Sequence, residues 1–182
     1  IEKIELEKSE NDNTLYPSLN DKNFNSKIAN KQEFMETKYD GTIYSNIQEH
    51  SDYLSGLDFT LQPQQLFVKN FMSFGTPYNS LLLYHGLGTG KTCSAIGICE
   101  EMRNYMKQIG KQKKIYIIAS ENVQNNFKKQ LFDETRLQNI NGMWHINSCA
   151  GKEFINEVNP LGTQYIPKDI LVKDIKNKIN DN

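Results

Sequence analysis

Hydrophobic and polar residues follow two different rhythms in the middle of the chain. Residues 81–84 (LLLY) and 114–119 (KIYIIA) are short, nearly continuous apolar runs, a pattern typical of β-strands buried on both faces. Between them, residues 92–107 place apolar side chains every three to four positions, which predicts an amphipathic helix. A strand, a helix and a second strand in this order predict a right-handed βαβ unit in a parallel sheet.

Four other segments carry a periodic pattern. Residues 59–75 and 120–136 have apolar positions at helical spacing, which predicts two more helices. Residues 142–147 (GMWHIN) predict a strand, and residues 170–179 predict a terminal helix or strand. Trp144 in the predicted strand has two interpretations: a core or interface residue, and a platform on which a nucleic-acid base stacks.

The first 58 residues differ in composition from the rest. They contain 12 acidic and 6 basic residues, against 10 acidic and 15 basic in residues 59–182. Aromatic residues nevertheless recur along this polar segment, which a wholly disordered tail does not need. We predict an acidic, partly extended arm over residues 1–58, with short helical turns, one of them over 26–37, held to the folded part by its aromatic side chains. The basic remainder suits phosphate ligands and nucleic acid.

A glycine-rich turn, HGLGTGKT at residues 85–92, joins the first predicted strand to the helix. Glycines let backbone N–H groups approach a phosphate closely, and the positive end of the following helix faces the same anion. In this pattern Lys91 contacts the β- and γ-phosphates of ATP and is the predicted catalytic residue, while the hydroxyl of Thr92 binds Mg²⁺. The predicted nucleotide-binding residues of the turn are His85, Gly86, Leu87, Gly88, Thr89, Gly90, Lys91 and Thr92. The alternative is a plain turn between a strand and a helix.

Two residues near this turn bear on the class of ATPase. His85 stands where the general pattern has glycine, a departure that superfamily 2 helicases tolerate. It is either a neighbour of the γ-phosphate or simply a strand-end residue. Gln65 lies in the preceding helix in the order Leu-x-Pro-x-Gln, and a side-chain amide can donate to and accept from the adenine edge at once. A resemblance to superfamily 2 proteins, which keep an adenine-binding glutamine in this helix, implies that Gln65 binds adenine; the alternative is a polar helix start.

An ATPase of this kind also needs an acidic residue for Mg²⁺ and a group that positions water. The Asp133–Glu134 pair lies in a charged helical stretch rather than at the end of a strand, and we reject it for this role. We therefore expect the N-terminal part of a longer ATPase, which alone binds ATP weakly and does not hydrolyse it efficiently. Lys128 and Lys129 have two interpretations: contacts to nucleic-acid phosphates, and a solvated helix face.

The three cysteines, Cys93, Cys99 and Cys149, lack the spacing of metal ligands or of a disulfide framework. We expect Cys93 and Cys99 to be buried thiols and the protein to occupy a reducing compartment. The sequence has no apolar run of membrane-spanning length, and its acidic start does not resemble a signal peptide. No membrane partner is expected.

Several of these stretches together resemble the superfamily 2 (DEAD-like) helicase-type ATPases of large DNA viruses, such as the poxvirus early transcription factor small subunit and nucleoside triphosphatase I. The resemblance lies in YPSLND and KIANKQEF within residues 16–40, in residues 60–67 with Gln65, in LLYHGLGTGKT within residues 81–92, and in residues 115–131. It implies an α/β fold: a P-loop RecA-like parallel sheet, the partial first motor lobe, over residues 59–182, preceded by the extended arm.

The resemblance also implies a function. Such proteins have two RecA-like lobes that close on ATP and move on or remodel double-stranded DNA. They act in early transcription, with the viral RNA polymerase or a transcription factor subunit, and are found in the virion and in the viral factory of the host cytoplasm. Two other function classes stay open: a P-loop nucleotide kinase, and a virion or assembly module that serves mainly for interaction.

Overall fold

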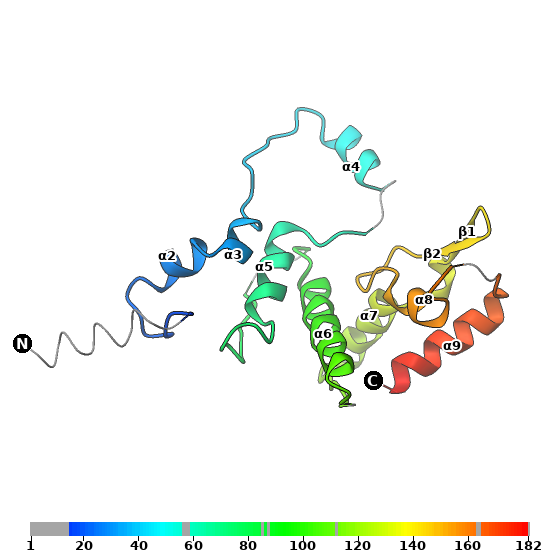
Figure 1. The fold of residues 1–182 in the computed structure, drawn as a ribbon. Coiled ribbons are helices and arrows are strands. Elements are labelled where there is room, and N and C mark those ends of the chain that lie inside the picture. Colours follow the sequence, from blue (N-terminus) through cyan, green and yellow to red (C-terminus); the bar gives the residue numbers. More distant parts are fainter. Residues whose placement is uncertain are drawn as a thin grey trace, which may run out of the picture.

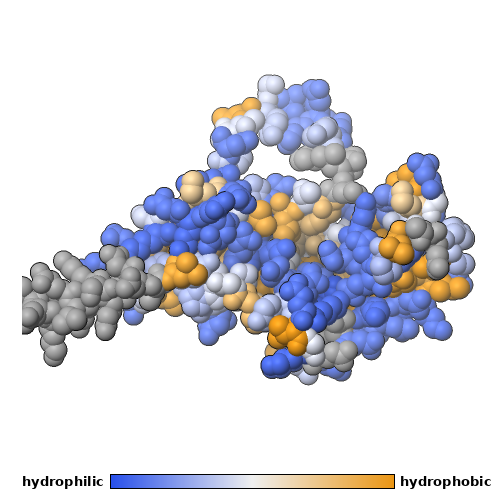
Figure 2. Space-filling view, viewed as in Figure 1, coloured by the Kyte–Doolittle hydropathy of each residue, from blue (hydrophilic) through white to orange (hydrophobic). Residues whose placement is uncertain are grey.

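The computed structural model describes residues 15–55, 59–84, 86, 88–111, 113–162 and 165–181, and this part of the chain is mostly helical (Figure 1). The helices are α2 (Phe24–Ala29), α3 (Gln32–Met35), α4 (Ile47–Ser55), α5 (Pro63–Phe71), α6 (Lys91–Gln108), α7 (Glu121–Leu131), η1 (Glu134–Arg136, a 3₁₀ turn), α8 (Glu153–Val158) and α9 (Lys168–Asp181). The strands are β1 (Gln138–Ile140) and β2 (Met143–His145). Figure 2 shows a largely hydrophilic face, on which hydrophobic residues lie in separate patches.

The structure overturns the predicted fold class. Within the described residues, the sheet is a single antiparallel hairpin of two strands, β1 and β2. Residues 81–84 and 114–119 form no strand, and side chains such as Leu82 (85% exposed) and Ile118 (97% exposed) face solvent. A strand exists only through hydrogen bonds to a neighbouring strand, and an apolar run does not by itself provide that neighbour. The RecA-like parallel sheet and its βαβ unit were therefore wrong predictions.

The helix predictions were more accurate than the strand predictions, because a helix depends on residues that are close together in sequence. α5 and α6 fall within or close to the predicted ranges 59–75 and 92–107, and residues 170–179 are helical in α9. The segment 120–136 forms a shorter helix than predicted, because α7 ends at Leu131 and a 3₁₀ turn follows. β2 confirms a strand within 142–147, and Asn141 and Gly142 close its hairpin with positive φ angles of 52° and 84°, as type I′ turns require.

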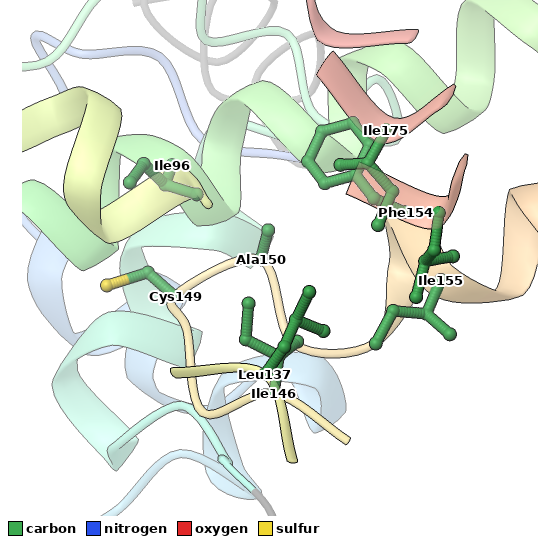
Figure 3. Close-up of a cluster of buried hydrophobic side chains, with 9 residues drawn as sticks. Ile96, Leu137, Ile146, Cys149, Ala150, Phe154, Ile155 and Ile175 are labelled. Carbon is green, nitrogen blue, oxygen red and sulfur yellow. The ribbon is translucent and has the colours of Figure 1, made fainter. Parts of the chain in front are cut away.

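The main hydrophobic core lies between α6, the hairpin, α8 and α9 (Figure 3). On α9, Leu171 and Ile175 are four residues apart and fully buried, so they present one apolar stripe to the core. Trp144 packs against this core, and its Nε1 donates a hydrogen bond of 2.8 Å to the Ile166 carbonyl. These contacts favour the core interpretation of Trp144. The buried members are Ile96, Leu137, Ile146, Cys149, Ala150, Phe154, Ile155, Leu171 and Ile175.

A second apolar group, the aromatic cluster, joins the acidic arm to α5. It consists of Tyr16, Phe24, Phe34, Phe67, Phe71 and Tyr78, which pack together with Ile28 and Met72. Tyr78 stacks on Phe71 with ring centroids 4.5 Å apart, and its hydroxyl donates 2.7 Å to the Pro17 carbonyl. The predicted helix over 26–37 is instead split into α2 and α3, because the backbone at Lys31 is extended (ψ 143°). α4 lies on a loop that extends away from these packed parts (Figure 1).

A buried ion-pair network holds α6 against α8. Arg103 is bonded to Glu100 on its own helix, with Nε 3.2 Å from both carboxylate oxygens, and to Glu157 on α8. The Arg103 guanidinium also lies 4.6 Å from the Phe154 ring centroid, within the range of a cation–π contact. Burial raises the pKa of Glu100 despite these bonds. The pKa of Glu157 is lowered, because hydrogen bonds from Lys107 and Arg103 outweigh the opposing effect of its burial.

No helix among the described residues is both long and apolar enough to span a bilayer.

Candidate nucleotide-binding site

The glycine-rich turn leads directly into α6. Gly88 (φ +77°) and Gly90 (φ +82°) adopt the left-handed conformation that other residues rarely take. Gly90 is the N-cap of α6, an 18-residue helix whose first turn has no side-chain cap. A Cβ atom at Gly90 would lie 2.2 Å from Nε2 of Gln65. The position therefore requires glycine for its backbone angle and for the space that Gln65 fills.

Lys91 folds back over the turn. Its Nζ donates a hydrogen bond of 2.7 Å to the Gly86 carbonyl, and the hydroxyl of Thr89 donates 2.9 Å to the same oxygen. The ammonium group thus lies on the loop side of the α6 N-terminus, where helix N–H groups without intrahelical partners also point. A cation beside the positive end of a helix provides a place for an anion.

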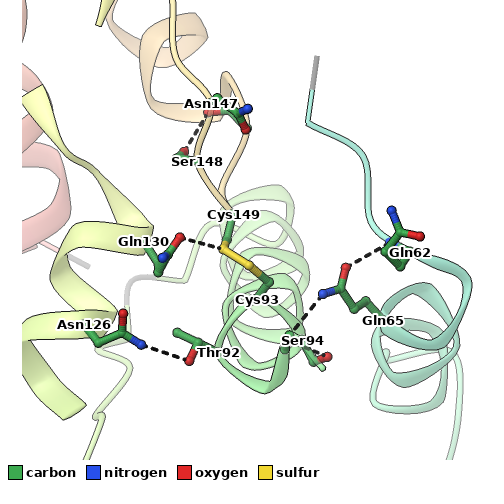
Figure 4. The surroundings of a disulfide bond; sticks show 12 residues. Gln62, Gln65, Thr92, Cys93, Ser94, Asn126, Gln130, Asn147, Ser148 and Cys149 are labelled. Atoms are coloured by element: carbon green, nitrogen blue, oxygen red, sulfur yellow. Dashed lines mark hydrogen bonds between the residues drawn. A yellow bond between two sulfur atoms is a disulfide. The ribbon is translucent and has the colours of Figure 1, made fainter. Parts of the chain in front are cut away.

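Thr92 lies in the first turn of α6 and is half-buried. Its Oγ1 accepts a hydrogen bond of 3.3 Å from Nδ2 of Asn126 on α7 (Figure 4). Sequence reasoning did not identify Asn126, because 34 residues separate it from Thr92. His85 and Leu87, which were also predicted to belong to the site, lie outside the described residues.

Gln65 lies against the loop, but its amide is engaged within the protein. Its Oε1 accepts 2.9 Å from the Gln62 N–H, which closes a capping box at the start of α5, and its Nε2 donates 3.3 Å to the Gly90 carbonyl. The residue is 5% exposed. Figure 4 shows the Gln65 side chain extending from α5 towards the first turn of α6. The structure therefore places Gln65 beside the predicted loop, where its side chain contacts the backbone of Gly90.

A disulfide stands beside the site. Cys93, the residue after Thr92, is bonded to Cys149 across 56 residues (Figure 4). The prediction of a buried thiol was wrong for Cys93, because the fold brings together two cysteines that are remote in sequence. The inference from cysteine spacing that the chain has no disulfide, on which the expected reducing compartment rested, was wrong for the same reason. Cys99 is a free thiol, and burial, with a smaller effect of the Glu100 charge, raises the pKa of that thiol.

The Asp133–Glu134 pair has contacts of its own outside the loop. The Asp133 carboxylate caps η1 by accepting 3.0 Å from the Thr135 N–H, and Glu134 forms an ion pair of 2.7 Å with Lys176. In the part of the chain that the structure describes, no group of three or more His, Cys, Asp or Glu side chains could hold a metal ion.

Comparison with known proteins finds relatives of this chain among the proteins of large DNA viruses. No protein-family model and no solved structure matches it. A protein of Acanthamoeba polyphaga mimivirus, named a putative ATP-dependent RNA helicase, is 32% identical over 130 residues, which are 69% of this chain and 11% of the relative. A second mimivirus protein of the same description is 30% identical over 117 residues, covering 64% of this chain and 18% of the relative.

A third relative comes from another virus. The early transcription factor large subunit homolog of African swine fever virus is 42% identical over 60 residues, which are 32% of this chain and 6% of the relative. The chain is a partial homologue of the putative helicases of large DNA viruses. The resemblance predicted from the loop and its flanking segments is thereby confirmed. This viral helicase homologue spans 11% and 18% of the two mimivirus proteins. The African swine fever virus relative is named for the large subunit of an early transcription factor, whereas the resemblance seen in the sequence was to the small subunit.

Proposed function

We propose that this chain is the ATP-binding part of a DNA-dependent ATPase of the helicase type, a translocase that acts in viral early transcription. The observation that carries the proposal is the glycine loop, in which the Lys91 ammonium lies 2.7 Å from the Gly86 carbonyl at the start of an uncapped 18-residue helix. The names of the mimivirus relatives, which describe ATP-dependent helicases, support ATP as the ligand.

Each residue of the loop has a proposed role. The backbone of residues 86–90 surrounds the phosphates, and Lys91 exchanges the Gly86 carbonyl for the β- and γ-phosphate oxygens. Thr92 offers its hydroxyl to Mg²⁺. Gln65 binds adenine by releasing its amide from the Gly90 carbonyl. His85 and Leu87 complete the proposed set.

Double-stranded DNA is the proposed nucleic-acid partner, and a viral RNA polymerase or transcription factor subunit is the proposed protein partner. The African swine fever virus relative is named an early transcription factor subunit homolog, which supports both. The mimivirus relatives are named RNA helicases, so RNA is the second candidate for the polynucleotide. The proposed location is the virion and the viral factory in the host cytoplasm.

Mg²⁺·ATP binding to this chain, measured by isothermal titration calorimetry, tests the nucleotide site. Lys91→Ala should abolish tight binding, whereas Lys111→Ala, which removes an exposed lysine after α6, should leave it unchanged. Gln65→Ala should reduce the preference for ATP over GTP. Unchanged affinity in Lys91→Ala would refute the phosphate role, and unchanged selectivity in Gln65→Ala would refute the adenine role.

Hydrolysis by the complete polypeptide tests the reaction class. Stimulation by duplex DNA without a phosphoryl acceptor would support the DNA-dependent ATPase, and stimulation by RNA alone would favour the second candidate. A strict requirement for a phosphoryl acceptor would favour a nucleotide kinase. If Lys91→Ala left the biological role intact in a folded protein, an interaction module would be the better description.

A further inference from the structure

Asn126 contacts the one loop residue to which the proposed function assigns Mg²⁺. Its Nδ2 lies 3.3 Å from Oγ1 of Thr92 and donates a hydrogen bond to it. Figure 4 shows the Asn126 amide turned from α7 towards the Thr92 hydroxyl. The contact joins two helices that are separated in sequence by the segment 109–120.

Contacts one turn further along α7 keep Asn126 in this position. Gln130 follows Asn126 by four residues, so the two side chains share a face of the helix. The Gln130 carbonyl accepts a hydrogen bond of 3.0 Å from the Cys149 N–H. Cys149 is joined by the disulfide to Cys93, the residue after Thr92. The last turn of α7 is therefore tied through the Gln130 backbone carbonyl, Cys149 and the disulfide to the first turn of α6, which Asn126 also contacts.

The hydrogen bond has a chemical consequence for the Thr92 hydroxyl. A threonine oxygen has two lone pairs, and the χ1 angle of a helical threonine divides between two rotamers. An N–H group that occupies one lone pair selects one rotamer and leaves the second lone pair for a cation. Mg²⁺ demands near-octahedral geometry, so a hydroxyl held in one orientation binds it better than a hydroxyl that rotates.

We propose that Asn126 is a positioning residue for Mg²⁺·ATP, which acts by fixing the rotamer of Thr92. This inference rests on the proposed function, because it takes Thr92 as the metal ligand. It assigns α7 a part in nucleotide binding. A displacement of α7 that breaks this hydrogen bond would lower the affinity for Mg²⁺ and leave the contacts of the loop with the phosphates unchanged.

The test compares ATP affinity in Mg²⁺ with ATP affinity in EDTA, by calorimetry on the full chain. Removing an outer-shell partner of a metal ligand typically lowers metal affinity at least tenfold, so Asn126→Ala should reduce the Mg²⁺-dependent gain in ATP affinity about tenfold. Affinity in EDTA should not change. Asn126→Leu keeps the approximate shape and is a better helix former, so it should show the same loss without a lower melting temperature. Asn125→Ala, at an exposed position of the same helix, is the matched control and should behave as wild type.

Thr92→Ala completes a double-mutant cycle. If Asn126 acts through Thr92, Asn126→Ala should have no further effect on the Mg²⁺-dependent gain once Thr92 is alanine. Additive losses, or equal losses in Mg²⁺ and in EDTA, would show a purely structural role and overturn the proposal. If the Mg²⁺-dependent gain in ATP affinity were lost in Thr92→Ala but kept in both Asn126 variants, this inference alone would be refuted. A gain unaffected by Thr92→Ala would refute the metal assignment itself.

Discussion

Reduction of the Cys93–Cys149 disulfide should lower the free energy of unfolding by about 4 kcal/mol. The two cysteines are 56 residues apart. In the chain-entropy model, the stabilisation grows with the logarithm of the closed loop, from about 3 kcal/mol for 15 residues to about 4.7 kcal/mol for 100 residues. Because the net stability of a domain is about 5–15 kcal/mol, this bond would supply a large share of it.

Urea denaturation of the wild-type chain, with and without a dithiol reductant, measures this difference without altering any side chain. The reductant transfers two electrons and two protons to the disulfide and becomes a disulfide itself. A thiol titration defines the two states: one free thiol, Cys99, before reduction, and all three cysteines after it. Cys99→Ser is the matched control and should lose as much stability on reduction as wild type. Cys149→Ala should not respond to the reductant.

Two results would refute this reasoning. One is equal stability of the oxidised and reduced chains when the thiol counts are one and three. The other is a count of three free thiols in the chain that has never been reduced, which would show that Cys93 and Cys149 are not bonded.

Three further predictions concern the loop, the ion-pair network and the arm. Gly90→Ala should weaken ATP binding and destabilise the fold by about 1–3 kcal/mol, because φ at Gly90 is +82° and Gln65 occupies the place of a Cβ atom. ATP titration measures the first effect and urea denaturation the second, and wild-type values in both would contradict the prediction. Arg103→Ala should cost about 3 kcal/mol in a thermal melt, because it leaves the buried Glu100 carboxylate without its cation, while Glu157 keeps its ion pair with Lys107. A loss below about 1 kcal/mol would contradict this. Burial, then the hydrogen bond to Glu33, raises the pKa of Tyr16 from 10.0 to about 12. The stability that comes from keeping the Tyr16 hydroxyl protonated is therefore fully present below pH 10 and is lost as the pH rises towards 12. Tyr16→Phe should flatten the pH dependence of the urea midpoint in this range.

The helices could be predicted because each depends on residues close to it in sequence. Pro63 sets the first turn of α5, and regular apolar spacing marks α6 and α9. The strands at 81–84 and 114–119 could not, because a strand depends on a partner that its own sequence does not specify. The hairpin had a local signal, Asn141–Gly142, but the prediction of a strand over 142–147 took Gly142 into the strand rather than into the turn.

The candidate site divides in the same way. The glycines, Lys91 and Thr92 are contiguous, so their spacing alone predicts a phosphate-binding loop. Its supports come from elsewhere: Gln65 is 25 residues from Gly90, and Asn126 is 34 residues from Thr92. Gln65 had a sequence signal in its Leu-x-Pro-x-Gln order, whereas Asn126 had none, because its contact with Thr92 forms only when α6 and α7 pack.

The aromatic cluster has a consequence for the integrity of the backbone. It fixes α2 and α3 on α5, whereas the described residues 40–55, which carry α4, belong to neither core. Ile43, in this segment, is 92% exposed. A protease that cut the chain there would produce two pieces that remain together, because the stacked rings rather than the peptide linkage hold the arm in place. This segment can therefore be nicked, lengthened or interrupted by an inserted domain while the arm stays docked.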